Sequence, residues 1–127
     1  MTRDARQPDG IARPGPPYSP VVIGGDLVFT AGQVAFDEQG RLAGGGIEDQ
    51  TARVLDNVEG CLAAAGCSMD DVLKVTAFLS DLGDFEGFNR VYAERFAPPY
   101  PARSTVGVRL ADGLLVEVEV VARRPAG

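Results

Sequence analysis

The sequence predicts one α+β domain of two layers, in which two helices pack on one face of a mixed six-stranded sheet. Its 127 residues are the usual length of a single domain. Two segments carry apolar residues at every third or fourth position, the pattern of amphipathic helices. Six short segments with β-branched or aromatic residues surround them and are typical of strands. The resulting order along the chain is β-β-β-α-β-α-β-β.

The beginning of the chain is expected to hold little regular structure. Residues 1–16 contain several prolines and little apolar periodicity, so we expect a flexible leader and then one domain over residues 17–127. Glycines between the first two strands predict a hairpin turn, and a second turn is expected at residues 37–40. The strands expected in this part are Val21–Ile23, Leu27–Ala31 and, as a continuation, Gln33–Phe36.

Each predicted helix is defined by one apolar stripe. From Ile47 to Ala65 the stripe repeats at three and four residues, and Gly66 stands where a C′ glycine ends a helix. Between the helices, Val72–Leu79 contains enough β-branched residues to be a strand. The second helix begins after Asp84 and runs to about Phe96. Its buried stripe is aromatic: Phe85, Phe88, Tyr92 and Phe96.

The last two strands are expected at Ser104–Val108 and Leu114–Arg123, after prolines that end the second helix. Along the final strand, apolar and acidic residues alternate and therefore lie on opposite faces of the sheet. We expect the sheet face that the helices leave open to carry apolar residues of this strand: Val116, Val118 and Val120. A small two-layer domain cannot leave a broad apolar face in water, so the sequence predicts self-association.

Composition and charge argue against several classes of function. The net charge is −6 and the isoelectric point is about 4.5, so the chain repels nucleic-acid phosphates and we expect no nucleic-acid partner. Histidine is absent, which removes the commonest general base and most zinc sites, and we expect no metal. Cys61 and Cys67 have no CxxC spacing and are interpreted as buried thiols. No apolar run approaches the roughly 20 residues of a membrane helix and no signal peptide is evident, so we expect a cytoplasmic protein without a membrane partner.

Arg103, Glu117 and Glu119 are the charged residues that most suggest chemistry. Arg103 lies between prolines and a predicted strand with no acid beside it, and a guanidinium forms paired hydrogen bonds to a carboxylate. Its partner is either a structural acid of the protein, which composition alone favours, or an anionic small molecule. Glu117 and Glu119 lie two apart and share one strand face. They form either a solvated polar stripe, which we favour for Glu119, or a pocket in which one of them carries a proton.

Pro101-Ala102-Arg103-Ser104 followed by Val116-Glu117-Val118-Glu119 is a specific pair of motifs. With it, the chain resembles the YjgF/RidA family of small trimeric imine deaminases over about residues 17–123. The remaining matches agree in order and spacing: Pro17-Tyr18-Ser19, Ala31-Gly32-Gln33, Leu55-Asp56-Asn57-Val58, Ala65-Gly66, Val75-Thr76-Ala77-Phe78, Phe88-Asn89, Tyr92 and Phe96.

The resemblance implies a chorismate-mutase-like fold assembled as a homotrimer, with three clefts at the subunit interfaces. It implies that Arg103 grips the substrate carboxylate and that Glu117 orients and deprotonates the attacking water. Tyr18 and Asn89 match residues that line the cleft, whereas the residues alone favour an edge position for Tyr18 and allow a solvated helix position for Asn89. Gly32 matches a position whose backbone borders the ligand, and by itself it is also compatible with a simple bulge.

Two positions depart from the family pattern. Ala31 stands where the family's well-studied deaminases have serine, which removes a hydroxyl donor near the substrate. Thr105 stands where they have cysteine, and it keeps a hydroxyl there. The segment from Arg103 to Glu117 is also one residue shorter than is usual in the family. We count Ala31 and Thr105 among the substrate-binding positions.

The expected function is hydrolysis of reactive 2-imino acids and their enamines, such as 2-aminoacrylate, to a 2-keto acid and ammonia. No cofactor is expected, because an iminium carbon is already electrophilic and needs only a well-placed activated water. The alternative is a non-catalytic protein that binds a small carboxylate in the same cleft, which Ala31 and Thr105 favour slightly. Endoribonuclease is an older label of the family, and the acidic charge and absent histidine argue against it.

Overall fold

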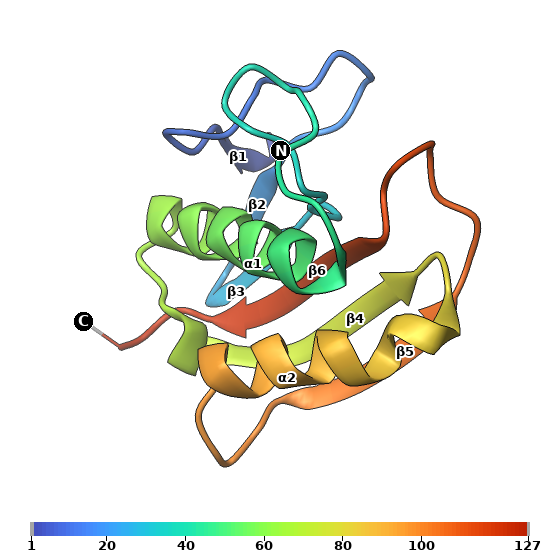
Figure 1. Cartoon of the computed structure of the whole chain (residues 1–127). Coiled ribbons are helices and arrows are strands. Elements are labelled where there is room, and N and C mark those ends of the chain that lie inside the picture. The colour runs from blue at the N-terminus through green and yellow to red at the C-terminus, as the bar shows by residue number, and fades with distance from the viewer. Residues whose placement is uncertain (1, 127) are drawn as a thin grey trace.

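Residues 2–126, which the computed structural model describes, form one mixed sheet with two α-helices on the same face of it (Figure 1). The elements are β1 (Asp4–Arg6), β2 (Val21–Gly24), β3 (Leu27–Thr30), α1 (Ile47–Ala64), β4 (Val72–Leu79), α2 (Phe85–Arg95), β5 (Ala102–Gly107) and β6 (Val116–Arg123), with short 3-10 helices at Met69–Asp71 and Leu82–Asp84. The strand order is β1-β2-β3-β6-β4-β5. The β4–β5 pair is parallel and the other neighbouring pairs are antiparallel. The predicted two-layer α+β fold is confirmed.

Helix α1 buries the apolar stripe that its sequence predicts. Glu48 and Asp49 lie in its first turn, where negative charge complements the positive end of the helix dipole. Gly66 has a φ of 76° just beyond the helix, the left-handed conformation expected of a C′ glycine. The stripe residues have no exposed surface: Val54, Leu55, Val58, Cys61 and Leu62.

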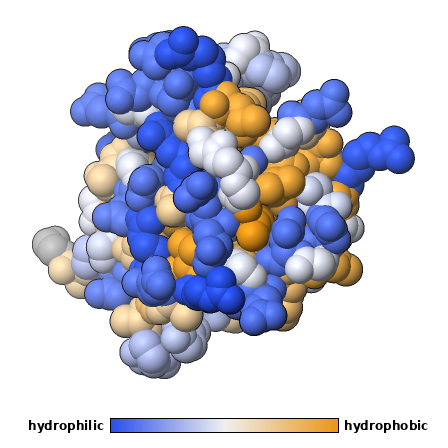
Figure 2. Space-filling view, in the orientation of Figure 1, coloured by the Kyte–Doolittle hydropathy of each residue, from blue (hydrophilic) through white to orange (hydrophobic). Residues whose placement is uncertain are grey.

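Helix α2 lies beside α1 and is joined to it by ion pairs. Arg95, in the last turn of α2, contacts Asp56 at 2.9 Å and Glu59 at 3.1 Å. In the middle of α2, Arg90 contacts Glu48 at 2.6 Å. Charged side chains therefore cover much of the outer helix surfaces, and Figure 2 shows this face as largely hydrophilic. An apolar area gathers beside it, around the point where the chain enters β6.

The apolar residues of β6 lie on the opposite face from the one predicted. Val116, Val118 and Val120 are buried beneath the helices, so their placement on the open face is wrong. Alternation along the strand places the valines and the glutamates on opposite faces. The helices pack on the more apolar of the two faces because their own apolar stripes must be buried. The open face still carries apolar side chains from other strands, among them Phe29 (44% exposed) and Val106 (41% exposed).

Strand β1 lies in a segment for which the sequence predicts no regular element. It pairs with β2 in an antiparallel register from Asp4 opposite Ile23 to Arg6 opposite Val21. The Arg6 guanidinium pairs with Asp4 at 2.8 Å and donates to the Ala64 carbonyl at the end of α1. The short β1 is therefore fixed to α1 as well as to the sheet.

Gln33–Phe36 does not continue β3 as a regular strand. Gln33 and Phe36 form isolated bridges, with Val118 and Leu42 respectively. The Asn57 side chain of α1 donates to the carbonyls of Val34 and Phe36, both at 3.0 Å. A helix side chain thus satisfies backbone groups that a neighbouring strand would otherwise pair.

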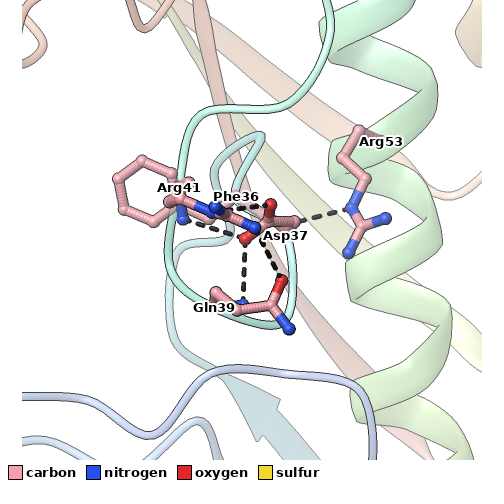
Figure 3. A network of polar contacts seen from close by, with 5 residues as sticks. All are labelled: Phe36, Asp37, Gln39, Arg41 and Arg53. Atoms are coloured by element: carbon pink, nitrogen blue, oxygen red, sulfur yellow. Dashed lines mark hydrogen bonds and ion pairs between the residues drawn. The ribbon is translucent and has the colours of Figure 1, made fainter.

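The predicted turn at residues 37–40 is organised by Asp37 (Figure 3). Its carboxylate accepts hydrogen bonds from the backbone N–H groups of Gln39 (2.9 Å) and Arg41 (3.0 Å). These bonds hold the pKa of Asp37 below its usual range, and the bond from Arg41 has the largest effect. Arg53 of α1 donates to the Phe36 carbonyl at 3.1 Å and so ties the turn to the helix.

Replacing Gln50 by leucine is expected to lower the free energy of unfolding by about 1–3 kcal/mol. The fully buried Gln50 side chain donates to the Gly113 carbonyl at 2.8 Å and accepts from the Leu115 N–H at 2.9 Å. Leucine fills the volume and leaves both backbone groups unpaired. Urea denaturation measures the loss, and Gln39→Leu at an exposed position of the turn serves as the control, with a change below about 0.5 kcal/mol. Equal effects of the two substitutions would contradict the assigned role.

Candidate active site

Arg103 lies on the helix side of the sheet, on the edge strand β5. In the parallel register it stands opposite Val75, which is buried beneath the helices. Its guanidinium carbon lies 4.6 Å from the ring centre of Tyr92, 5.3 Å from that of Phe88 and 5.7 Å from that of Phe85. Cation–π contacts of this kind stabilise a partly desolvated cation and hold its plane. The aromatic residues of α2 therefore position the Arg103 guanidinium.

No carboxylate neutralises Arg103 within residues 2–126. Its guanidinium forms neither an ion pair nor a hydrogen bond that meets ordinary geometric limits with any of these residues. A structural salt bridge, the role that composition alone favours, is thus not made inside the described chain. A half-buried guanidinium without an anion has its paired donors available for a ligand carboxylate.

An open cavity of about 340 Å³ lies in front of Arg103. Asn89 of α2 and Tyr100 from the proline-rich segment both form part of its wall. The structure thus brings together Arg103 and Asn89, which are distant in the sequence. The full lining is Asn89, Tyr92, Ala93, Tyr100, Pro101 and Arg103.

Two buried hydroxyls near Arg103 have no hydrogen-bond partner among the described residues. One is that of Tyr92, a residue only 5% exposed, and the other is that of Thr105, two positions along β5 on the same face as Arg103. Burial raises the pKa of Tyr92, and the Arg103 charge partly offsets this. Unpaired buried hydroxyls are rare, and Tyr92 lines the cavity, so a polar ligand there would give its hydroxyl the partner it lacks.

Glu117 belongs to a second cluster, on the open face of the sheet. Its carboxylate lies against the backbone of Gly32, so closely that a Cβ atom on Gly32 would come within 2.7 Å of the Glu117 Cδ atom. Burial, and secondly the negative charge of Glu119, raise the pKa of Glu117 above its usual range. A carboxylate with a raised pKa is a stronger proton acceptor than a fully solvated glutamate, which suits a group that accepts and returns a proton.

Tyr18 and Ala31 lie near Gly32. Tyr18 is 54% exposed and lines, together with Gly32, a small cavity of about 80 Å³. The Ala31 N–H donates to the Pro20 carbonyl at 2.8 Å, which holds the segment before Gly32 beside the segment that follows Tyr18. Ala31 presents a methyl group and no hydroxyl, so polar recognition here depends on the backbone.

The sheet separates the two clusters in one chain. Arg103 shares its face with Val75 and Val120, whereas Glu117 shares the other face with Phe78. One strand, β4, lies between β5 and β6. The helix-side cluster therefore contains Arg103, Asn89 and Thr105. The open-face cluster contains Glu117 and Gly32, with Ala31 next to Gly32 in the chain, and Tyr18 lines the small cavity beside Gly32.

Comparison with known proteins gives the family. The sequence model of the endoribonuclease L-PSP family, the older label of YjgF/RidA, matches residues 10–124. The chain belongs to the YjgF/RidA family. A RutC family protein of Pyrococcus horikoshii is 45% identical over 124 residues, which are 96% of this chain and 94% of the relative. The resemblance that the sequence motifs indicate is confirmed.

Solved structures of the YjgF/RidA family share the fold closely. The crystal structure of RidA from an Antarctic Psychrobacter has a TM-score of 0.89 at 36% identity and covers 95% of this chain and 99% of its own. That of yeast Mmf1 has a TM-score of 0.92 at 31% identity and covers 98% of this chain and all of its own, 100%.

The aromatic stripe of this YjgF/RidA protein is predicted from the sequence to be buried, and Phe88, Tyr92 and Phe96 are, whereas Phe85 is 43% exposed. Phe85, Phe88 and Tyr92 also form the surface against which the Arg103 guanidinium lies. The one signal available was the tyrosine among phenylalanines, because a buried hydroxyl requires a partner.

The described part of this YjgF/RidA chain offers no obvious metal centre. Within residues 2–126, no group of three or more histidine, cysteine, aspartate or glutamate side chains is arranged to hold a metal ion. Cys61 and Cys67 are buried free thiols, and burial raises the pKa of Cys61 to about 12. In the same residues, no helix has the length and apolar character required to cross a membrane.

Proposed function

We propose that the protein is a hydrolytic deaminase of 2-imino acids and their enamines, releasing a 2-keto acid and ammonia. The observation that carries the proposal is Arg103, a half-buried cation held on aromatic rings with no anion beside it among residues 2–126. A small molecule with one carboxylate supplies that anion. The unpaired hydroxyl of Tyr92, which lines the same cavity, offers a further hydrogen bond to the ligand.

In the proposed reaction Glu117 acts on water. It accepts a proton from a water molecule as the water oxygen attacks the carbon of the protonated imine, and a tetrahedral carbon bearing OH and NH₂ forms. Glu117 then gives the proton to nitrogen, which becomes NH₃⁺. The C–N bond breaks as the hydroxyl oxygen forms the carbonyl and returns its proton to Glu117, and the keto acid and ammonia leave, the ammonia taking up this proton as ammonium. A carboxylate whose pKa is raised by burial is better matched to these transfers than a fully solvated one.

The two clusters lie on opposite faces of one sheet, so one chain cannot place Arg103 and Glu117 around one substrate. We propose a homotrimer in which Arg103 of one copy faces Glu117 of the next. The open face supports this arrangement, because Phe29 and Val106 expose apolar surface beside the glutamates.

Static light scattering is expected to give three times the 13.4 kDa mass of the chain at micromolar concentration. Covering the apolar open face by a cyclic arrangement of copies provides the driving force. A monomer mass would contradict both the trimer and the shared site.

Glu119→Gln is expected to move the acidic limb of the rate profile to lower pH and to leave the rate near pH 7.5 almost unchanged. The base is active when deprotonated, so the rate rises as pH passes the pKa of Glu117. Glu119 raises that pKa by its charge, and glutamine has none. Profiles of kcat/KM against pH for wild type, Glu119→Gln and the remote control Glu38→Gln measure the shift. A limb that does not move, or that moves to higher pH, contradicts this coupling.

A binding protein without catalysis is the second candidate, and Ala31 favours it. The absence of a hydroxyl there leaves the wall beside Gly32 with backbone groups alone. Endoribonuclease activity is disfavoured, because the chain has no histidine and a net charge of −6.

One assay distinguishes the enzyme from the binding protein. A pyridoxal-phosphate-dependent dehydratase generates 2-aminoacrylate in the presence of semicarbazide, which traps the imine. If the protein is a deaminase, the trapped product falls as protein is added. If trapping is unchanged while a 2-keto acid binds at equilibrium, the protein is a carboxylate-binding member of the family.

A further inference from the structure

We propose that Gly32 is a positioning residue: its missing side chain leaves the space in which the Glu117 carboxylate lies. The inference rests on the proposed function of Glu117 as the base. A Cβ atom on Gly32 would lie 2.7 Å from Glu117 Cδ and 3.0 Å from Cγ, and closer still to Oε2. All three atoms belong to the reacting end of one side chain, so any side chain at position 32 must displace the carboxylate.

The backbone conformation of Gly32 does not itself require glycine. Gly25, Gly40 and Gly66 have positive φ angles, which favour glycine for conformational reasons, and Gly32 is not among the glycines with such angles. An alanine is therefore compatible with the local backbone. The steric conflict is confined to the end of the Glu117 side chain, which can rotate away at little cost to the fold.

A bulge between β3 and β6 brings Gly32 to this place. Phe29 pairs with Val121 and Gln33 bridges to Val118, so Thr30–Gly32 oppose only Glu119 and Val120. The extra residue interrupts the regular backbone hydrogen bonds between the two strands. At this point the Val120 N–H donates to the buried Thr30 hydroxyl at 3.0 Å instead of to a backbone carbonyl.

Hydrogen bonds on both sides make this wall rigid. Beyond the bulge, Gln33 and Val118 exchange two backbone hydrogen bonds of 2.8 and 3.0 Å. Before it, the Ala31 N–H donates to the Pro20 carbonyl. Because hydrogen bonds hold the backbone on both sides of Gly32, a side chain added at position 32 would displace the Glu117 carboxylate rather than the backbone. The absence of a side chain on Gly32 thereby determines the position of the carboxylate that accepts the proton.

Gly32→Ala is expected to lower kcat for imine hydrolysis about 10- to 100-fold with little change in KM. A displacement of about 1 Å of a reacting group is enough for losses of this size. In the proposed trimer the carboxylate of the substrate is held by Arg103 of a neighbouring copy, so binding is spared. Gly24→Ala is the matched control, because a Cβ at Gly24 meets nothing within 4 Å and its φ is not positive. Both variants should unfold at nearly the wild-type temperature.

A double-mutant cycle separates positioning from a general structural effect. If Gly32 acts through Glu117, then Gly32→Ala costs little further rate in a Glu117→Gln background. An unchanged kcat in the single variant, or a full additional loss in the double variant, overturns the inference.

A spectroscopic measurement keeps this test independent of the proposed activity. With ¹³Cδ-labelled glutamate, the Glu117 resonance, identified by its absence in Glu117→Gln, should shift in Gly32→Ala and stay in place in Gly24→Ala. If no deaminase activity is found but the resonance shifts as expected, the proposed function fails and the seating of Glu117 by Gly32 stands. If the resonance does not move in Gly32→Ala, the seating itself is refuted.

Discussion

Replacement of Glu117 by glutamine is expected to lower the rate of imine hydrolysis about 10²- to 10⁴-fold, the usual value of a positioned acid–base group. Glutamine keeps the shape of the side chain against Gly32 but cannot accept a proton from water. Binding of a 2-keto acid should change little, because the helix-side cluster around Arg103 holds the carboxylate. The measurements are steady-state hydrolysis and equilibrium binding on the same preparation.

Glu119→Gln is the matched control for this substitution. Glu119 shares the strand and the face of Glu117, and its variant should retain the wild-type rate near pH 7.5. If wild type and Glu117→Gln hydrolyse the imine equally fast while both bind the keto acid, Glu117 is not the base. In that event the cleft recognises carboxylates without converting them.

Replacement of Arg103 by lysine is expected to weaken binding of a 2-keto acid about 10- to 100-fold, since a charge-assisted hydrogen bond contributes about 1.5–3 kcal/mol. Lysine keeps the positive charge but has no planar fork, so one of the paired hydrogen bonds to the ligand is lost. The rings of Phe88 and Tyr92 remain in place to pack against the lysine stem, and the fold should be retained.

Isothermal titration calorimetry measures this loss, and Arg109→Lys provides the control. Arg109 is exposed beyond the end of β5 and should tolerate lysine without effect. If keto-acid affinity is the same in Arg103→Lys and wild type, the substrate carboxylate is held elsewhere. The model of the site as two clusters would then need a different anion-binding group.

The regular elements could be predicted because their residues carry local signals. The strand at Val72–Leu79 has the predicted bounds, and α1 begins at Ile47 as its apolar stripe indicates. The departures occur where distant groups decide. Strand β1 exists because the edge of β2 accepts it and Arg6 reaches the end of α1. Gln33–Phe36 is irregular because Asn57 of the helix satisfies its carbonyls.

The sequence alone determined the fold class and the family, and it proposed Arg103 and Glu117 as the residues most suited to chemistry. Apolar periodicity defines helices and strands locally, and an arginine without a neighbouring acid is visible in the chain itself. Only the tertiary structure decided that Arg103 and Glu117 lie on opposite faces, and that Gly32 touches the glutamate. Alternation along a strand says that two faces exist but does not say which one the helices cover. That choice, like the bulge at Gly32, depends on pairing between strands far apart in the sequence, whose register is set by burial of the whole core.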